Sequence, residues 1–157
     1  MKRTSTLFHL DRILNADALA TGVAQVAGVA KSAVATADFA DVDRVPVTWF
    51  SDHHDFGIQF DTMRGDFPQE ITVVSHEPRD FESFVRALAP ALGATILTDE
   101  FGVESWTDDQ WLMLTPDGDV TKVFASEEDF GDDDPAITLL PEYRARYEAR
   151  NVEVVTP

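Results

Sequence analysis

The chain has no cysteine among its 157 residues, which excludes disulfide bonds and thiolate metal sites. It also lacks any run of about 18 apolar residues, the length that a membrane-spanning helix needs. The segment Met1-Lys2-Arg3 is not followed by the apolar run of a signal peptide. These absences predict a cytoplasmic protein with no membrane partner.

Positive charge is scarce as well. Three Lys and nine Arg stand against 29 Asp and Glu, which gives a formal net charge of −17 and a sequence pI near 4.3. Each contact to a nucleic-acid phosphate needs a basic side chain that displaces a counterion. The composition therefore predicts that the chain has no nucleic-acid partner.

Catalytic motifs are missing too. The sequence contains no G-x-S-x-G nucleophile elbow and no glycine-rich loop of the kinds that bind mononucleotide or dinucleotide phosphates. No motif predicts a cofactor. The sequence thus favours a non-catalytic protein, although enzymatic activity stays open.

What the chain has in excess is negative charge, and most of it lies in one stretch. Residues 97–134 hold thirteen Asp and Glu against one base, Lys122, whereas residues 1–96 hold thirteen acids and eight bases. Crowded like charges raise the free energy of a compact state, so the stretch suggests a surface that meets a positively charged partner. A general adaptation to solubility is the alternative, and it would spread the acids more evenly.

Aromatic residues interleave with these acids, and aromatic anchors inside a polar rim are common in protein interfaces. Trp106 and Phe130 have polar neighbours and are the best candidates for exposed anchors. The residues predicted to bind a partner are Glu104, Trp106, Asp108, Asp109, Glu127, Glu128, Asp129, Phe130, Asp132, Asp133 and Asp134.

One cluster of metal-ligating residue types gives a second hypothesis. Asp52, His53, His54 and Asp55 are consecutive, and His76 comes directly after a later predicted strand. Imidazole and carboxylate groups bind zinc, manganese or iron. If the strands before the cluster and before His76 end at the same edge of a sheet, the five residues could form the centre of a metal-dependent hydrolase.

The triplet Asp52-His53-His54 resembles the motif that names the DHH phosphoesterases, which bind two manganese ions. Residues 15–19 resemble the end of that family's upstream aspartate segment. However, Asn15 stands where the companion aspartate of Asp17 is expected, and the two segments are closer together than that fold requires. We therefore do not assign the chain to this family.

Hydrophobic periodicity predicts one α+β domain over residues 1–157, with a mostly antiparallel sheet of about five to six strands, two main helices and a short C-terminal helix. Helices are expected from residue 15 or 17 to about 35, from Asp80 to Gly93, and over 141–150. Seven segments are candidates for these strands, namely 4–10, 45–50, 56–63, 70–75, 94–98, 111–114 and 120–125, and a solvated loop is expected over 127–134.

These observations favour a non-catalytic acidic module, similar in physical character to an immunity or inhibitor protein, that masks a basic surface of a partner protein. The metal-dependent hydrolase is one alternative. An accessory or structural subunit whose acidity serves only solubility is the other. The sequence does not predict an oligomeric state.

Overall fold

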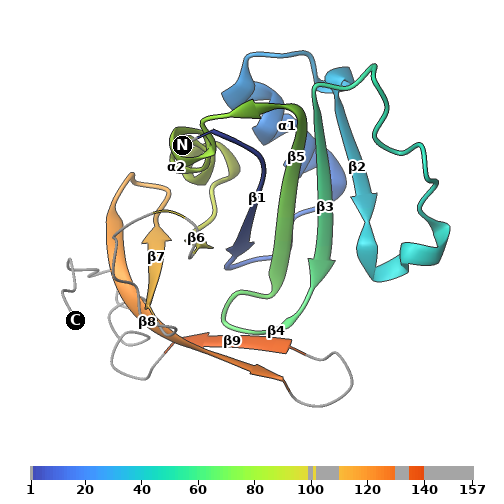
Figure 1. Cartoon of the computed structure of the whole chain (residues 1–157). Helices are drawn as coiled ribbons and strands as arrows, with labels where there is room; N and C mark the ends of the chain where they lie inside the picture. Colours follow the sequence, from blue (N-terminus) through green and yellow to red (C-terminus); the bar gives the residue numbers. More distant parts are fainter. Residues whose placement is uncertain (1, 99–100, 102–109, 130–134, 140–157) are drawn as a thin grey trace.

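A computed structural model describes residues 2–98, 101, 110–129 and 135–139 (Figure 1). The predicted C-terminal helix over 141–150 lies outside the described residues. The described residues have an α+β fold, as the sequence predicted, with a mixed and mostly antiparallel sheet.

Nine strands of the described chain follow the order β2-β3-β5-β1-β6-β7-β8-β9-β4, which is more than the five to six expected. The β2–β3 and β4–β9 pairs are parallel, and all other pairs in this order are antiparallel. The strands are β1 (Arg3–Leu10), β2 (Val34–Asp38), β3 (Phe56–Thr62), β4 (Arg64–Gly65), β5 (Gln69–Arg79), β6 (Ile96–Thr98), β7 (Gln110–Leu114), β8 (Val120–Asp129) and β9 (Pro135–Leu139).

Two helices, α1 (Ala16–Ala27) and α2 (Phe81–Leu92), begin and end at residues that cap them. The side chain of Asn15 accepts a hydrogen bond from the Ala18 N–H, and that of Asp80 accepts one from the Ser83 N–H. Gly28 and Gly93 end the helices with φ of 70° and 61°, a conformation that glycine adopts without strain. Helix α1 is therefore shorter than predicted, because Gly28 ends it before residue 35.

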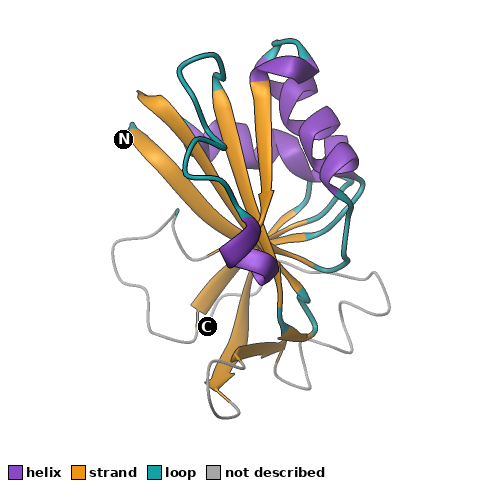
Figure 2. Ribbon diagram, turned by 90° about the vertical axis from the view of Figure 1, so that its right-hand side faces the viewer, coloured by secondary structure: helices purple, strands orange, loops and turns teal. Residues whose placement is uncertain are grey.

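Both helices cover the same face of the sheet (Figure 2). They pack closely on each other because Gly22 of α1 has no Cβ; a Cβ there would lie 2.3 Å from Leu92 Cδ2. The sheet contributes alternate residues such as Phe8, Leu10 and Ile71 to the core beneath the helices.

The opposite face carries a second, smaller core. It contains Phe67, Leu97, Trp111, Met113, Val123 and Ile137. Strand β4 lies in the connection between β3 and β5, yet it pairs with β9 from the far end of the chain. The strand order therefore curls back on itself, and Figure 1 shows β9 running beside β4 at the bottom of the molecule.

Three sequence predictions about strands are wrong. Residues 45–50 do not form a strand; they are turns and bends, whereas Val34–Asp38, assigned to a helix and a loop, is strand β2. Strand β8 continues through Asp129 and pairs with β9, so residues 127–129 are not part of a loop. Residues 130–134 lie outside the described residues.

Candidate functional site

The acidic stretch is described only in part. Glu127, Glu128 and Asp129 lie on β8, where their backbones pair with Ile137, Ala136 and Pro135 of β9. The other residues predicted to bind a partner lie outside the described residues: Glu104, Trp106, Asp108, Asp109, Phe130, Asp132, Asp133 and Asp134. The described part therefore places the start of the last acidic run on a strand of the sheet.

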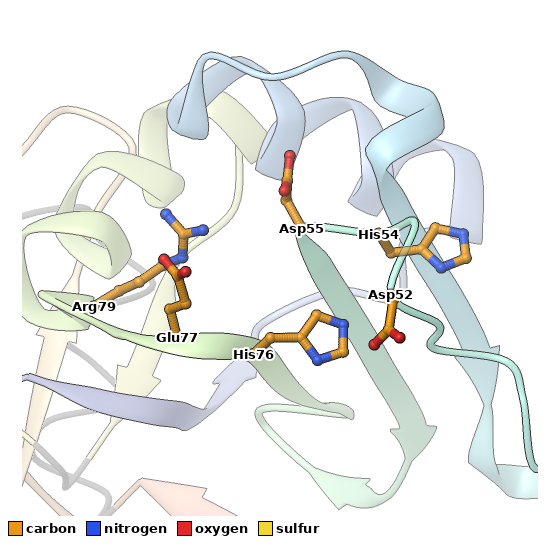
Figure 3. A pocket seen from close by; sticks show the side chains of 6 residues that line it. All are labelled: Asp52, His54, Asp55, His76, Glu77 and Arg79. Atoms are coloured by element: carbon orange, nitrogen blue, oxygen red, sulfur yellow. The ribbon is translucent and has the colours of Figure 1, made fainter.

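The predicted histidine and aspartate cluster lies at a cavity of about 270 Å³ (Figure 3). Residues 52–55 belong to the connection between β2 and β3, and they meet the end of β5 there. The cavity is lined by Asp52, His54, Asp55, His76, Glu77 and Arg79. His53 is exposed and does not line the cavity. The structure thus brings four of the five predicted residues together.

Ser51 holds both cavity histidines in place. Its N–H donates to His54 Nδ1 at 3.1 Å, its hydroxyl lies 3.1 Å from the same nitrogen, and its carbonyl oxygen lies 2.9 Å from His76 Nε2. One nitrogen of each imidazole therefore already has a protein partner. Among the described residues, no three His, Asp or Glu side chains are arranged to hold a metal ion.

The Ser51–His54 pair has the residue types of a nucleophile and its base, but its geometry is that of a local turn. The His54 N–H donates to the Ser51 carbonyl at 3.0 Å, so the contact closes a turn of four residues. Within the described chain, His54 makes no hydrogen bond to a carboxylate that would orient its ring, as a catalytic triad requires. The pair therefore gives no support to nucleophilic catalysis.

Aromatic contacts fix the connection that carries these residues. The ring of Phe50 stacks on His76 with 4.1 Å between centroids and 9° between planes. Trp49 contacts Phe50 and also Phe39, at centroid distances of 5.7 and 6.0 Å. These four side chains attach the long β2–β3 connection to the end of β5.

Arg79 supplies the cationic wall of the cavity. Its guanidinium carbon lies 4.4 Å from the centroid of the Phe56 ring, and its Nε is buried without a hydrogen-bond partner among the described residues. The cavity therefore combines three carboxylates, two imidazoles and one guanidinium. This mixed lining does not select a ligand of one charge.

His9 has a structural environment away from this cavity. It is 4% exposed, lies on β1, and packs edge-on against Trp111 of β7 at 5.8 Å. Burial lowers the pKa of His9 to about 4, because the apolar surroundings disfavour the imidazolium. Hydrogen bonds from the Ser83 hydroxyl and N–H lower the pKa of Asp80, in keeping with its role as a helix cap.

Residues 38–55 form a second acidic segment that was not predicted from the sequence. Residues 38–55 contain five Asp and one Arg, but the average over residues 1–96 concealed this local excess. Two of the apolar side chains in the segment are exposed, Val42 at 56% and Val47 at 99%. A charge count over windows the length of a loop would have found it.

Comparison with protein-family models, with curated proteins and with solved structures gave no match. No helix in the described part of the chain is long and apolar enough to cross a membrane.

Proposed function

We propose that the protein is a non-catalytic acidic module that binds a basic surface of a partner protein. The observation that carries the proposal is the charge distribution: residues 97–134 have thirteen acids and one base, and residues 38–55 have five acids and one base. Complementary charge accelerates encounter and selects the partner. The candidate contact residues are those predicted from the sequence, from Glu104 to Asp134.

Two features of the described residues support a binding role over the metal-dependent hydrolase. His54 and His76 use ring nitrogens in contacts with Ser51, and His76 also stacks on Phe50. Nδ1 of His54 uses its lone pair to accept the hydrogen bond from the Ser51 N–H, and among the described residues no three His, Asp or Glu side chains are arranged to hold a metal ion. The exposed Val42 stands between Asp41 and Asp43 in the sequence, and Val47 is exposed in the same connection; apolar side chains beside polar ones are typical of an interface.

The test is affinity capture on the intact protein from a lysate of its native cells, followed by mass spectrometry and binding measurements with the purified partner. The test variant carries Glu127→Gln, Glu128→Gln and Asp129→Asn. We expect it to bind the partner at least about tenfold more weakly, since three interfacial charges are lost.

A matched control neutralises three exposed carboxylates outside residues 38–55 and 97–134, with Asp17→Asn, Glu77→Gln and Glu82→Gln. It changes the net charge by the same amount, so only position differs between the two variants. We expect the affinity of the control for the partner to stay within about threefold of that of the unmodified chain, because charges outside the interface have small effects on affinity. Equal affinities of both variants and the unmodified chain would instead support the accessory subunit whose acidity serves only solubility.

A further inference from the structure

Strand β2 is an edge strand of the sheet. It begins the strand order, and in the described chain it pairs with β3 alone, from Val34↔Phe56 to Asp38↔Phe60. About half of the backbone N–H and C=O groups of such a strand point away from its only neighbour. An open edge of this kind can accept a further strand.

A groove of about 260 Å³ lies along this edge. The residues that line it come from β2 on one side and from the β2–β3 connection on the other: Thr36, Ala37, Asp38, Asp41, Arg44, Val45, Pro46 and Trp49. Figure 1 shows the connection leaving the end of β2 and running outside it before it returns to β3. The groove therefore follows the edge of the sheet.

Trp49 fixes the connection at a distance that keeps this groove open. Its indole lies over Gly57 of β3, where an added Cβ would be 2.8 Å from Trp49 Cη2. Phe39 supports the same indole edge-on at 6.0 Å. Because the outer wall is attached to the sheet through these rings, the groove is part of the fold.

The groove has an acidic rim with apolar side chains beside it. Asp38 and Asp41 line the groove and are exposed, and Asp43 is exposed in the same connection. Arg44 forms an ion pair with Asp41 at 3.3 Å in which both side chains are more than half exposed. Such a pair contributes little stability, so a cation from a partner can compete with Arg44 at modest cost. The exposed Val42 and Val47 belong to the same connection.

We propose that the groove beside β2 binds an extended segment of the basic partner protein, which adds a strand to the free edge of the sheet. Backbone hydrogen bonds to β2 supply affinity, as in other cases of strand addition. An aliphatic side chain of the segment enters the groove between Ala37 and Trp49, and its Lys or Arg side chains meet Asp38, Asp41 and Asp43. The inference that this partner segment is positively charged rests on the proposed function.

The test uses the full chain and a set of capped heptapeptides in which Lys alternates with Val, Ile or Leu. Peptides of the same pattern with Glu in place of Lys are the charge control. We expect at least one Lys peptide to bind and to slow amide hydrogen exchange in residues 34–38 by at least about tenfold, because new backbone hydrogen bonds protect these amides. Methylation of alternate peptide nitrogens should weaken the binding by a similar factor.

Several results would overturn the inference. These are failure of every Lys peptide to bind at about 1 mM, equal binding of the Glu peptides, or binding that leaves exchange in residues 34–38 unchanged. A triple variant, Asp38→Asn, Asp41→Asn and Asp43→Asn, should bind the best Lys peptide at least about fivefold more weakly. The Asn at position 38 can still accept the hydrogen bond from the Ala40 N–H. The control variant Asp17→Asn, Glu77→Gln and Glu82→Gln should bind like the unmodified chain.

The outcome separates this inference from the proposed function. If the captured partner requires Glu127, Glu128 and Asp129 but does not protect β2, the binding module stands and the docking site is wrong. If Lys peptides protect β2 while no basic partner is captured, the edge site stands and the proposed function is wrong. If no Lys peptide protects β2, and neutralising Glu127, Glu128 and Asp129 leaves partner binding unchanged, both proposals are wrong. The β2–β3 connection then serves only to shield an edge strand.

Discussion

At the scale of single residues, the buried imidazole of His9 makes a specific contribution to stability. Its Nδ1 is buried and has no hydrogen-bond partner in the part of the chain that the structure describes, and its ring contacts Trp111. The protonated form would place an unpaired charge in this apolar environment, which is unfavourable. His9 is therefore neutral in the folded chain near neutral pH, and its titration links stability to pH.

The prediction concerns the free energy of unfolding below neutral pH. The pKa of His9 is about 4 in the folded chain and about 6.5 when unfolded. The unfolded state binds more protons between these values, so the stabilisation is complete above about pH 6.5 and is lost as the pH falls toward 4. Between pH 7 and pH 5 the loss is about 2 kcal/mol.

His9→Phe keeps a ring against Trp111 and removes this titration. Urea unfolding at pH 7 and at pH 5 should therefore show a loss about 2 kcal/mol larger in the unmodified chain than in the variant. Carboxylates titrate in both proteins, so the difference isolates His9. Equal losses in the two proteins would show that His9 does not carry the pH dependence.

At the scale of elements, the β2–β3 connection depends on the contact between Trp49 and the backbone of β3. Gly57 leaves room for the indole, since an added Cβ would lie 2.8 and 2.9 Å from Trp49 Cη2 and Cζ3, and 2.9 Å from Val74 Cγ2. The glycine thus marks a position where a side chain from a loop packs closely on the backbone of the sheet.

Gly57→Ala should destabilise the fold by about 1 to 3 kcal/mol, because the added methyl group overpacks this contact. The same substitution in a Trp49→Ala background should cost less, since one of the two crowded neighbours is gone. Unfolding measurements on the four proteins give the coupling energy directly. An identical cost of Gly57→Ala in both backgrounds would mean that Trp49 does not lie on Gly57.

The elements differ in how well the sequence predicts them, for physical reasons. Helix α2 has a capping aspartate, an apolar stripe and a closing glycine, and all three signals agree. Strand β2 is rich in alanine and follows an alanine-rich helix, so its pattern resembles a continuation of that helix. The aromatic residues at 49 and 50 suggest a strand, yet they pack against Phe39, His76 and Gly57 from a loop.

The candidate site shows the same limit. The sequence predicted that His76 would approach residues 52–55 if two strands ended at one edge of the sheet. The cavity brings these segments together, although residues 45–50 are not a strand. The sequence did not indicate that Ser51 would contact a ring nitrogen of both histidines. The contact with His54 depends on a local turn, and the contact with His76 joins residues that lie 25 positions apart. The groove beside β2 could not be predicted either. Its prediction would have required that Val34–Asp38 be identified as a strand and that this strand be placed at the edge of the sheet.

At the scale of the whole molecule, the proposed binding role depends on where the negative charge is concentrated. The two cores lie on opposite faces of a curled sheet, and neither core requires the acids of residues 38–55 or 97–134. The net charge of −17 raises the free energy of the compact chain. A binding role gives this unfavourable concentration of charge a function.

The most direct test of this claim is the affinity of the captured basic partner for the full chain, measured by calorimetry at about 0.1 M and about 1 M salt. The Debye length falls from about 10 Å to about 3 Å over this range. The account predicts that the Kd rises at least about tenfold, because screening weakens the attraction between the acidic module and its partner. A Kd that is unchanged between the two salt concentrations would contradict it.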